Sequence, residues 1–331
     1  MATQTQDLVK DPELRISNKP ETRRFGGGFR IMKQYVRALR APFLAGSIVP
    51  VIIGSALAFT DKTFSFPLFL IVLLGITALH LGSNLINDYY DARGSDPINI
   101  RLTPFSGGSR VIQNKEISPP VILLMAIGFF VIALFTGLWL AHLGKPIAIV
   151  IGLLGLVAGW AYSSPPLQLM SRGAGELIIF LAFGPLITLG TYYVMSGHLS
   201  WQAFAIGIPQ GFLIGEVIWI NQFPDFQADQ QAGKKNLVVR LGPRISRYLY
   251  CAFMLAAFII VILLVGIPGI SYLAMLGLIA FPLALKAMRI LWREYLSHEA
   301  LIPAQALTVQ TLVAQGLLLS LGLVLSRFIH I

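Results

Sequence analysis

Charge and cysteine are both scarce in this chain. Only 12% of its 331 residues are charged, 15 residues are acidic, and Cys251 is the one cysteine. A single cysteine excludes an intrachain disulfide and is typical of a side chain packed in an apolar run. The low charge comes with 56% hydrophobic residues and a mean hydropathy of +0.73. This composition excludes a soluble domain of such length and indicates a polytopic membrane protein.

Long apolar runs fill the sequence after a polar N-terminal stretch. A helix that spans a bilayer needs about 20 mostly apolar residues. By that measure we predict an all-α protein with nine transmembrane helices. Their starts are expected near Ala41, Phe66, Pro119, Pro146, Gly175, Trp201, Arg247, Gly269 and Gln305. Residues 1–28 are predicted to be a disordered cytoplasmic tail, and residues 29–331 to form one membrane domain that opens with an interfacial helix at Phe29 and Ile31.

Basic residues divide unevenly between the two sides of this bundle. With nine helices, 22 of the 25 Lys and Arg residues fall in the N-terminal tail or in loops on the same side. The opposite side carries Lys62, Lys145 and Arg327. Because cytoplasmic loops are enriched in Lys and Arg, we predict an integral protein of the cell (inner) membrane, with its N-terminus in the cytoplasm and its C-terminus outside. The net charge of +10 is then a topological signal that also attracts anionic lipid headgroups, and no nucleic-acid partner is expected.

Two acidic strings stand at the ends of the second and sixth predicted helices. NDYYDARGSD runs from Asn87 to Asp96 and NQFPDFQAD from Asn221 to Asp229, and together they hold five of the 15 acidic residues. Carboxylates beside hydrocarbon are costly and usually serve a function. Both helices exit on the predicted cytoplasmic side, so the two strings are expected to share one end of the bundle.

Spacing within each string places the polar residues on one helix face. The residues four apart are Asn87 and Asp91 in the first string and Asn221, Asp225 and Asp229 in the second. Residues at this spacing share a face of a helix. We expect Pro224 to kink or end the sixth helix, and Gly94 to break the second so that Asp96 folds back from a loop. Carboxylate and amide oxygens suit Mg²⁺, which usually completes its shell with waters and substrate phosphates.

Cationic and glycine-rich segments follow each string. PFSGGSR, ending at Arg110, offers backbone N–H groups, a hydroxyl and a guanidinium, and AGKKN offers the ammonium groups of Lys234 and Lys235. Arg and Lys recognise phosphate through charge-assisted hydrogen bonds. Carboxylates, a metal ion that bridges them to phosphate, and basic side chains together make a clamp that can bind a diphosphate. Beside an apolar bundle this clamp predicts a polyprenyl diphosphate, whose leaving group is stabilised by Mg²⁺ and cations and whose allylic cation is stabilised by rings such as Tyr162.

These segments resemble the UbiA superfamily of intramembrane prenyltransferases. The matching parts are NDYYDARGSD, PFSGGSRVIQ, YSSPP and NQFPDFQADQQAGKKNLVVRLG, and the resemblance extends from about Arg37 to the ninth helix. It implies nine helices around a central cavity with a lateral opening for the prenyl tail, and Mg²⁺-dependent transfer of a prenyl group to an aromatic acceptor. The spacing from Asp91 to Asp96 and the run GKKNLVVRLG are similar to the menaquinone branch, which prenylates 1,4-dihydroxy-2-naphthoate.

The resemblance also implies residue roles. Ligands of a first Mg²⁺ would be Asn87, Asp91 and Asp96, and ligands of a second would be Asn221, Asp225 and Asp229. The implied catalytic residues are Asp91, Asp225 and Asp229. The implied substrate-binding residues are Asn87, Asp88, Ser109, Arg110, Tyr162, Asn221, Lys234 and Lys235.

Several alternatives stay open from the sequence. The acceptor could instead be 4-hydroxybenzoate, homogentisate, a lipid alcohol or haem. A divalent-cation transporter is an alternative of another class, although carboxylates at one membrane face rather than at mid-depth argue against it. His80 is either a packed or pore-lining residue or a ligand, and Glu216 is either a cavity residue or simply protonated. Arg172 either anchors the fifth helix or meets an acceptor carboxylate.

Overall fold

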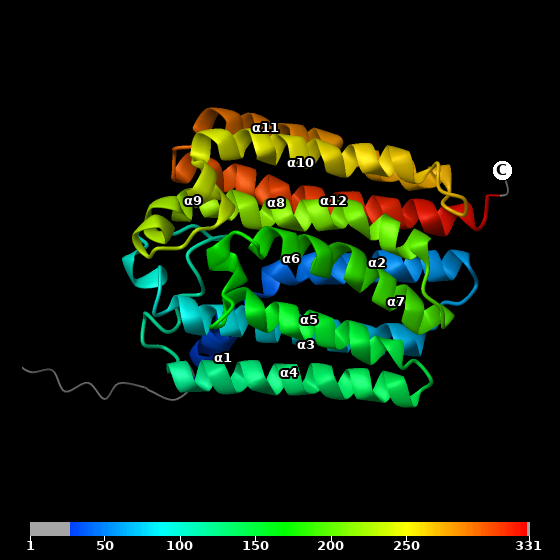
Figure 1. Cartoon of the computed structure of the whole chain (residues 1–331), viewed down its shortest axis with the longest axis horizontal. Helices are drawn as coiled ribbons and strands as arrows, with labels where there is room; N and C mark the ends of the chain where they lie inside the picture. The colour runs from blue at the N-terminus through cyan, green and yellow to red at the C-terminus, as the bar shows by residue number, and fades with distance from the viewer. Residues whose placement is uncertain (1–26, 330–331) are drawn as a thin grey trace, which may run out of the picture.

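Helices and their connecting loops make up the described part of the chain, residues 27–329, in a computed structural model (Figure 1). No strand occurs within that range. Seven crossings are single helices: α2 (Ala45–Thr60), α3 (Phe66–Asp91), α4 (Pro119–His142), α5 (Ile147–Ser163), α8 (Trp201–Gln231), α10 (Pro243–Leu264) and α12 (Ile302–Ser326). Two are joined pieces: α6 (Gly175–Leu181), the π-helical turn η4 (Ala182–Leu186) and α7 (Ile187–Ser196); and η5 (Tyr272–Ala280) with α11 (Phe281–Glu294). The short elements are α1 (Gly27–Ala38), η1 (Ala41–Leu44), η2 (Asp96–Ile98), η3 (Leu169–Arg172), α9 (Leu237–Leu241) and η6 (Glu299–Leu301).

The predicted all-α fold with nine crossings is confirmed. Eight helical segments between residues 27 and 329 are long and apolar enough to span a membrane, and α5 is a shorter apolar helix of 17 residues. The starts predicted at Arg247 and Gln305 fall inside α10 and α12, because Pro243 and Pro303 each occupy a first helical turn, where proline is tolerated. The predicted tail, residues 1–28, lies outside the described residues except for its last two, which already belong to α1.

Pro224 does not end the sixth crossing. The structure carries α8 without a break from Trp201 through Pro209 and Pro224 to Gln231. Of the two predicted effects of Pro224, a kink or an end of the helix, the end is therefore wrong. Proline inside a transmembrane helix is tolerated because neighbouring helices and side chains satisfy the freed backbone groups. The consequence is that Asp225 and Asp229 lie on regular helix, four residues apart on one face.

Close helix packing brings α8 into the middle of the bundle. A Cβ placed on Gly184 of η4 would lie 2.4 Å from the backbone nitrogen of Gly211, and one on Gly211 would lie 2.6 Å from the carbonyl oxygen of Phe180. Small residues at such crossings let two backbones approach in a membrane. With α8 held against the α6–α7 crossing, its C-terminal end and that of α3 lie at the same end of the bundle, at the left of Figure 1.

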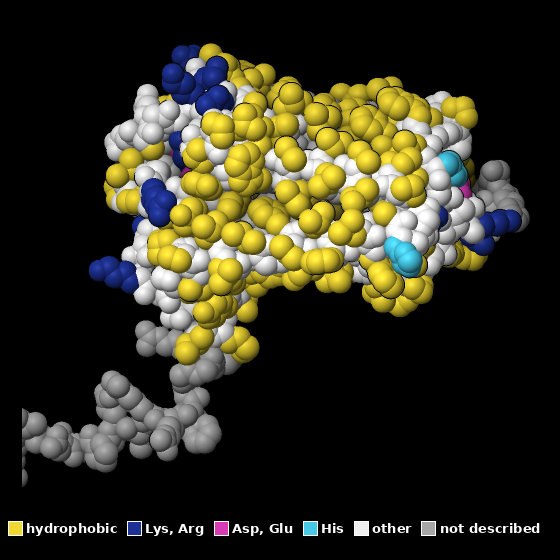
Figure 2. Space-filling model, turned by 60° about the horizontal axis from the view of Figure 1, so that its bottom comes forward, with side chains coloured by type: hydrophobic (Ala, Val, Ile, Leu, Met, Phe, Trp, Pro, Cys, Tyr) yellow, Lys and Arg dark blue, Asp and Glu magenta, His cyan; other side chains and the backbone are white. Residues whose placement is uncertain are grey.

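An apolar band surrounds the bundle. Large exposed hydrophobic side chains lie along the outer faces of several crossings, among them Phe135 on α4, Leu154 on α5 and Leu263 on α10. Figure 2, which looks toward the α4 side, shows Lys and Arg side chains at the two ends of the molecule and hydrophobic side chains between them. This distribution is that of an integral membrane protein.

Candidate active site

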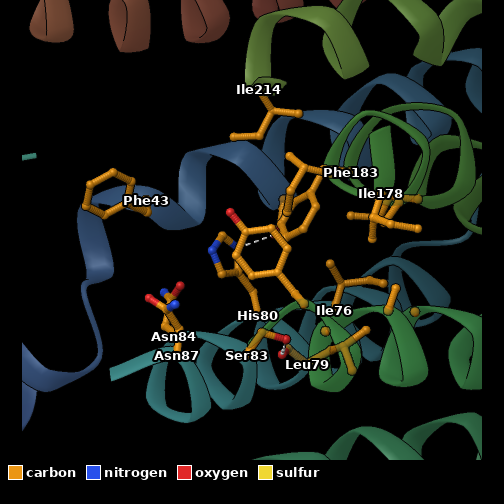
Figure 3. A pocket seen from close by; sticks show the side chains of 18 of the residues that line it. Phe43, Ile76, Leu79, His80, Ser83, Asn84, Asn87, Ile178, Phe183 and Ile214 are labelled. Carbon is orange, nitrogen blue, oxygen red and sulfur yellow. Dashed lines mark hydrogen bonds between the residues drawn. The ribbon is translucent and has the colours of Figure 1, made fainter. Parts of the chain in front are cut away.

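A cavity of about 260 Å³ opens among α3, α5, the α6–α7 crossing and α8. One face of α3 supplies much of its wall through residues three and four apart, the spacing of a helix face. These α3 residues are Val72, Gly75, Ile76, Leu79, His80, Ser83, Asn84, Asn87 and Asp91. The wall is therefore apolar through the middle of the bundle and polar at the end of α3. Figure 3 shows this change along the helix, with Ile76 and Leu79 on one side of His80 and Asn84 and Asn87 on the other.

The end of α3 is held by a network around Asn87. The Asn87 amide donates to the Asp91 carboxylate one turn later at 3.0 Å and to the Ser163 hydroxyl at the end of α5, also at 3.0 Å. Its carbonyl oxygen accepts a hydrogen bond of 3.3 Å from Arg40, which precedes η1. Asn87 thus ties three elements together beside Asp91 and fixes the direction in which that carboxylate faces.

Asp96 reaches the cavity from the loop after α3, as predicted. It starts η2, and its carboxylate accepts a 2.9 Å hydrogen bond from the Gln113 side chain. Gly108 packs directly on it, since a Cβ there would lie 2.5 Å from an Asp96 carboxylate oxygen. Burial, followed by the charges of Asp91 and Asp88, raises the pKa of Asp96 to about 7.

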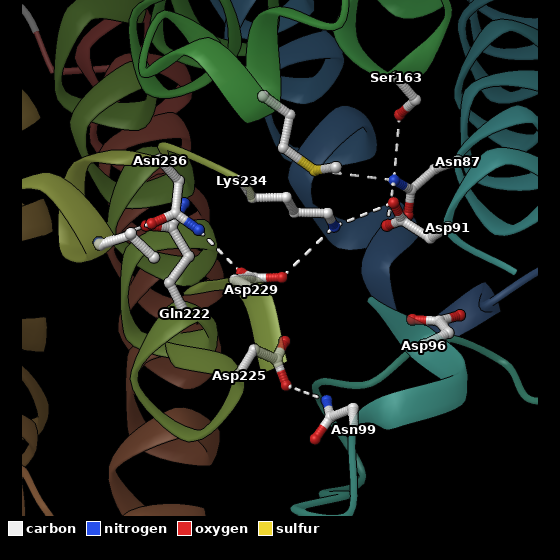
Figure 4. Close-up of polar contacts among 12 residues, drawn as sticks. Asn87, Asp91, Asp96, Asn99, Ser163, Gln222, Asp225, Asp229, Lys234 and Asn236 are labelled. Atoms are coloured by element: carbon white, nitrogen blue, oxygen red, sulfur yellow. Dashed lines mark hydrogen bonds and ion pairs between the residues drawn. The ribbon is translucent and has the colours of Figure 1, made fainter. Parts of the chain in front are cut away.

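The second acidic string lines the same cavity from α8. Asp225 accepts a 2.7 Å hydrogen bond from the Asn99 amide, and Asp229 accepts one of 2.8 Å from Asn236. The cavity wall also includes Asn221, whose side-chain oxygen accepts a 2.9 Å hydrogen bond from Gln305. Figure 4 shows the carboxylates of both strings facing one another across the space between α3 and α8.

Lys234 lies between the two strings. Its ammonium group is 2.9 Å from an Asp91 oxygen and 3.4 Å from an Asp229 oxygen (Figure 4). Burial alone would lower the pKa of Lys234, but the Asp91 and Asp229 carboxylates outweigh it and raise that pKa. One cation therefore contacts carboxylates from α3 and α8 at once, so the two strings are close enough to share a positively charged ligand.

Of the predicted site residues, eight line the cavity and four do not. Those in its wall are Asn87, Asp91, Asp96, Tyr162, Asn221, Asp225, Asp229 and Lys234. Those outside its wall are Asp88, Ser109, Arg110 and Lys235. The Asp88 carboxylate accepts from the Ser109 backbone at 3.3 Å, Arg110 donates to the Asp96 carbonyl oxygen, and Lys235 is exposed. Asp88, Ser109 and Arg110 therefore fix the loop that carries Asp96, while Lys235 faces outward.

Among the polar residues of the cavity wall that were not predicted from the sequence are Arg40, Asn99 and Asn236. Arg40 stands at a break between two helical segments, with a left-handed backbone at φ 51°. In the sequence it is one of many basic residues on the N-terminal side, and nothing there distinguishes it. Asn99 lies three residues after Asp96, and Asn236 lies two residues after Lys234. Their closeness to these motif residues was the feature of the sequence that could have identified them.

The structure also separates the residues whose roles were left open. His80 lines the cavity, is hydrogen-bonded to Ser47 and packs edge-on against Phe183 at 5.0 Å, as a pore-lining residue does. Glu216 is 1% exposed and lies outside the cavity wall, so it is not a cavity residue. Arg172 is exposed and donates to the Pro166 carbonyl oxygen at 2.7 Å, away from the cavity.

The cavity has oxygen donors for Mg²⁺ but no ready-made cage. Within residues 27–329 no three His, Cys, Asp or Glu side chains converge closely enough to hold a metal by themselves. The donor chemistry nevertheless fits, because four carboxylates and several amide oxygens line one polar chamber, and Mg²⁺ binds through one or two carboxylates together with waters and substrate phosphates. The predicted ligand sets stay a prediction.

Comparison with known proteins decides the family. Residues 47–325 match the model of the UbiA prenyltransferase family. The chain belongs to that family. It is therefore a prenyltransferase, and the resemblance inferred from its acidic motifs is confirmed.

Curated UbiA-family relatives cover most of the chain. The 1,4-dihydroxy-2-naphthoate octaprenyltransferase of Mycobacterium leprae (strain TN) is 30% identical over 257 residues, which are 77% of this chain and 84% of the relative. The protein of the same name from Bacillus subtilis (strain 168) is 28% identical over 289 residues, 86% of this chain and 90% of the relative.

Solved UbiA homologues share the fold. The homologue from Archaeoglobus fulgidus bound to DMAPP and Mg²⁺ superimposes with a TM-score of 0.64 at 18% identity, over 87% of this chain and 99% of that one. A homologue from Aeropyrum pernix K1 without ligand gives 0.60 at 15% identity, over 85% of this chain and 97% of that one.

Proposed function

We propose that this UbiA-family enzyme transfers a polyprenyl group from a polyprenyl diphosphate to 1,4-dihydroxy-2-naphthoate, in a reaction that needs Mg²⁺. The observation that carries the proposal is the joint position of Asp91, Asp96, Asp225 and Asp229 at the polar end of a cavity whose remainder is apolar. Such a cavity suits a substrate with a diphosphate head and a hydrocarbon tail. The names of the Mycobacterium leprae and Bacillus subtilis relatives support the naphthoate as acceptor.

The acidic end of the cavity requires positive charge before a diphosphate can enter. Asn87, Asp91 and Asp96 would hold one Mg²⁺ and Asn221, Asp225 and Asp229 another. A metal held there would neutralise charge on the diphosphate and make it a better leaving group. The Archaeoglobus fulgidus homologue was solved with both GPP and Mg²⁺, which supports binding of a prenyl diphosphate together with Mg²⁺.

Lys234 is the residue of this chain placed to hold the diphosphate itself. Its side chain is 11% exposed, and its ammonium group already contacts both Asp91 and Asp229. When the substrate enters, the same group donates hydrogen bonds to phosphate oxygens and stabilises the charge that grows as the bond between the allylic carbon and the diphosphate oxygen breaks.

The rest of the cavity protects and directs the allylic cation. A ring carbon of the acceptor attacks the cation and forms the new carbon–carbon bond. That ring carbon then loses its proton, or its carboxylate as CO2, and the ring becomes aromatic again. Tyr162 lines the cavity and offers an aromatic face to the cation. The apolar side chains of the remaining wall exclude water that would otherwise capture the cation.

Arg40 supplies a site for the carboxylate of the acceptor. Arg40 and Lys234 are the two Lys or Arg side chains in the described cavity wall, and Lys234 is engaged by two carboxylates. Arg40 makes one 3.3 Å hydrogen bond to Asn87 and lies 3.8 Å from Asp88, so its guanidinium retains donors for a planar anion. An acceptor with a ring carboxylate, such as the naphthoate, fits this arrangement better than a lipid alcohol does.

Purified enzyme with radiolabelled polyprenyl diphosphate and a panel of acceptors tests the proposal. The expected result is prenylated product from 1,4-dihydroxy-2-naphthoate that requires Mg²⁺ and disappears with EDTA. If 4-hydroxybenzoate or homogentisate were prenylated and the naphthoate were not, the proposed acceptor would be wrong and the proposed prenyl transfer would stand. Product formation that is insensitive to EDTA would reject the metal-dependent mechanism.

A further inference from the structure

The cavity extends far enough along the bundle to hold a prenyl chain. Its α3 wall extends from Asp91 to Val72, a distance of about 28 Å at the rise of an α-helix, and the apolar part from His80 to Val72 makes up about 12 Å of it. The far end of the cavity is formed by side chains such as Leu140 and Val194. The full length of the cavity approaches the roughly 30 Å thickness of the hydrocarbon core of a bilayer. We call this apolar part of the cavity, from His80 to Val72, the gallery.

The gallery also reaches the lipid-facing surface, between α4 and α5. Leu134 on α4 and Leu153 on α5 both line it, yet they are 37% and 44% exposed. Farther along, the two helices approach each other, since a Cβ on Gly137 would lie 3.7 Å from the Cα of Ile149. The side opening therefore lies on the diphosphate side of that approach, between Leu134 and Leu153.

Gly152 stands at this opening and has no packing role. A Cβ built there has no described atom within 4 Å. Gly155 and Gly159 on the same helix differ, because a Cβ on either would lie 2.9 Å from Leu79 or 2.2 Å from Ser83 on α3. The latter two glycines serve close helix packing, whereas the missing side chain of Gly152 leaves open space in the gallery.

We propose that Gly152 determines the length of prenyl chain that the enzyme accepts. The proposal rests on the proposed function and names the occupant of the gallery as the hydrocarbon tail of the diphosphate donor, because the gallery is continuous with the carboxylate end of the cavity. Ser163, which contacts Asn87 at that end, is eleven residues from Gly152, or about 16 Å along α5. A short donor ends before Gly152, whereas a long one passes it and leaves through the opening between Leu134 and Leu153.

Filling the space at Gly152 tests the inference. Gly152→Phe adds a ring at a position that lines the cavity and where a Cβ has no described atom within 4 Å. Gly128→Phe is the matched control, because Gly128 lies on the exposed side of α4, has no described atom near its Cβ position and does not line the cavity. The kcat/KM values for geranyl diphosphate and for a long-chain polyprenyl diphosphate are compared with the same acceptor. In Gly152→Phe we expect the long donor to lose about tenfold or more and the short donor to stay within about twofold, with both unchanged in Gly128→Phe.

Other outcomes separate the inference from the proposed function. Wild-type enzyme that prenylates no acceptor with either donor would reject the proposed function. Wild-type activity with an unchanged chain-length profile in Gly152→Phe, or an equal loss for both donors, would overturn the role of Gly152. A second pair covers the case in which Gly152→Phe fails to fold: Leu134→Trp narrows the opening from α4, and Leu138→Trp enlarges an exposed residue of α4 outside the gallery. The inference requires Leu134→Trp alone to disfavour the long donor.

Discussion

Two carboxylates on α8 differ in their surroundings. Asp225 lines the cavity and accepts a hydrogen bond from Asn99, whereas Glu216 is turned away from the cavity. Asp225→Asn removes a charge from the acidic end while keeping its shape, so we expect prenyl transfer to fall about 100-fold or more. Glu216→Gln makes the same chemical change on the same helix and should keep near wild-type turnover. Initial rates at saturating Mg²⁺ measure both.

Thermal unfolding of the two variants provides the control for that comparison. A loss of activity in Asp225→Asn that is matched by unfolding, or an equal loss in Glu216→Gln, would show that α8 needs its carboxylates for folding rather than for the reaction.

Adjacent lysines give a second pair of matched residues. Lys234 spans Asp91 and Asp229, while Lys235 points outward and is exposed. Lys234→Gln leaves the carboxylates without their shared cation and removes a phosphate donor, so we expect the KM for the prenyl diphosphate to rise about tenfold. Lys235→Gln should leave that KM unchanged. If both variants bound the donor as wild type does, Lys234 would have no part in diphosphate binding.

For single residues, the sequence predicts some positions in the site and cannot distinguish others, such as Lys234 from Lys235. The carboxylates were predictable because Asp at a membrane boundary is rare and the four-residue spacing sets one helix face. Lys234 and Lys235 were indistinguishable because the turn between them and α8, with Gly233 at φ 75°, decides which one faces inward. Arg40 was missed for a related reason, since a left-handed residue between two helical segments redirects its side chain.

Among the elements, the loop between α3 and α4 determines whether Asp96 reaches the cavity. Gly108 holds a left-handed backbone at φ 73°, and a Cβ there would collide with the Asp96 carboxylate. Gly108→Ala should therefore displace Asp96 and raise the Mg²⁺ concentration needed for half-maximal activity by about tenfold or more. Gly94→Ala in the same loop meets nothing closer than 3.7 Å and should behave as wild type. Mg²⁺ titrations of initial rate give the comparison, and an unchanged requirement in Gly108→Ala would show that Asp96 takes no part in metal binding.

The helices themselves were predictable to within a few residues. Hydropathy and the distribution of Lys and Arg gave all nine crossings, because both reflect the membrane rather than details of packing. Pro224 misled the prediction because its effect in water is to break a helix, while in a packed bundle α8 continues to Gln231. Loop conformations such as η2 depend on contacts with Gly108 and Gln113, which local sequence does not reveal.

For the whole molecule, the site is a consequence of helix direction. The second and sixth crossings, α3 and α8, run parallel, so their C-terminal ends and their acidic strings meet at one end of the bundle (Figure 1). The apolar face of α3 continues from these acids through the bundle. The proposed substrate, with a polar head group and a hydrocarbon tail, would fit a single cavity of this kind.

The orientation of this cavity in the membrane is the last prediction. Because most Lys and Arg residues fall on the side where the acidic strings end, the diphosphate end should face the cytoplasm. Cys251→Ala removes the single native thiol, and Lys235→Cys and Lys62→Cys then place one exposed thiol at each end. A membrane-impermeant maleimide should label Lys62→Cys in intact cells stripped of any outer membrane, and Lys235→Cys only in inverted vesicles. The opposite pattern would invert the topology and require both substrates to enter from outside. Five crossings, from α3 to α8, separate Lys62 from Lys235, so the two positions should lie on opposite sides of the membrane. Labelling of both variants on one side would contradict this odd number of crossings. It would also contradict the parallel arrangement of α3 and α8 that brings the acidic strings together.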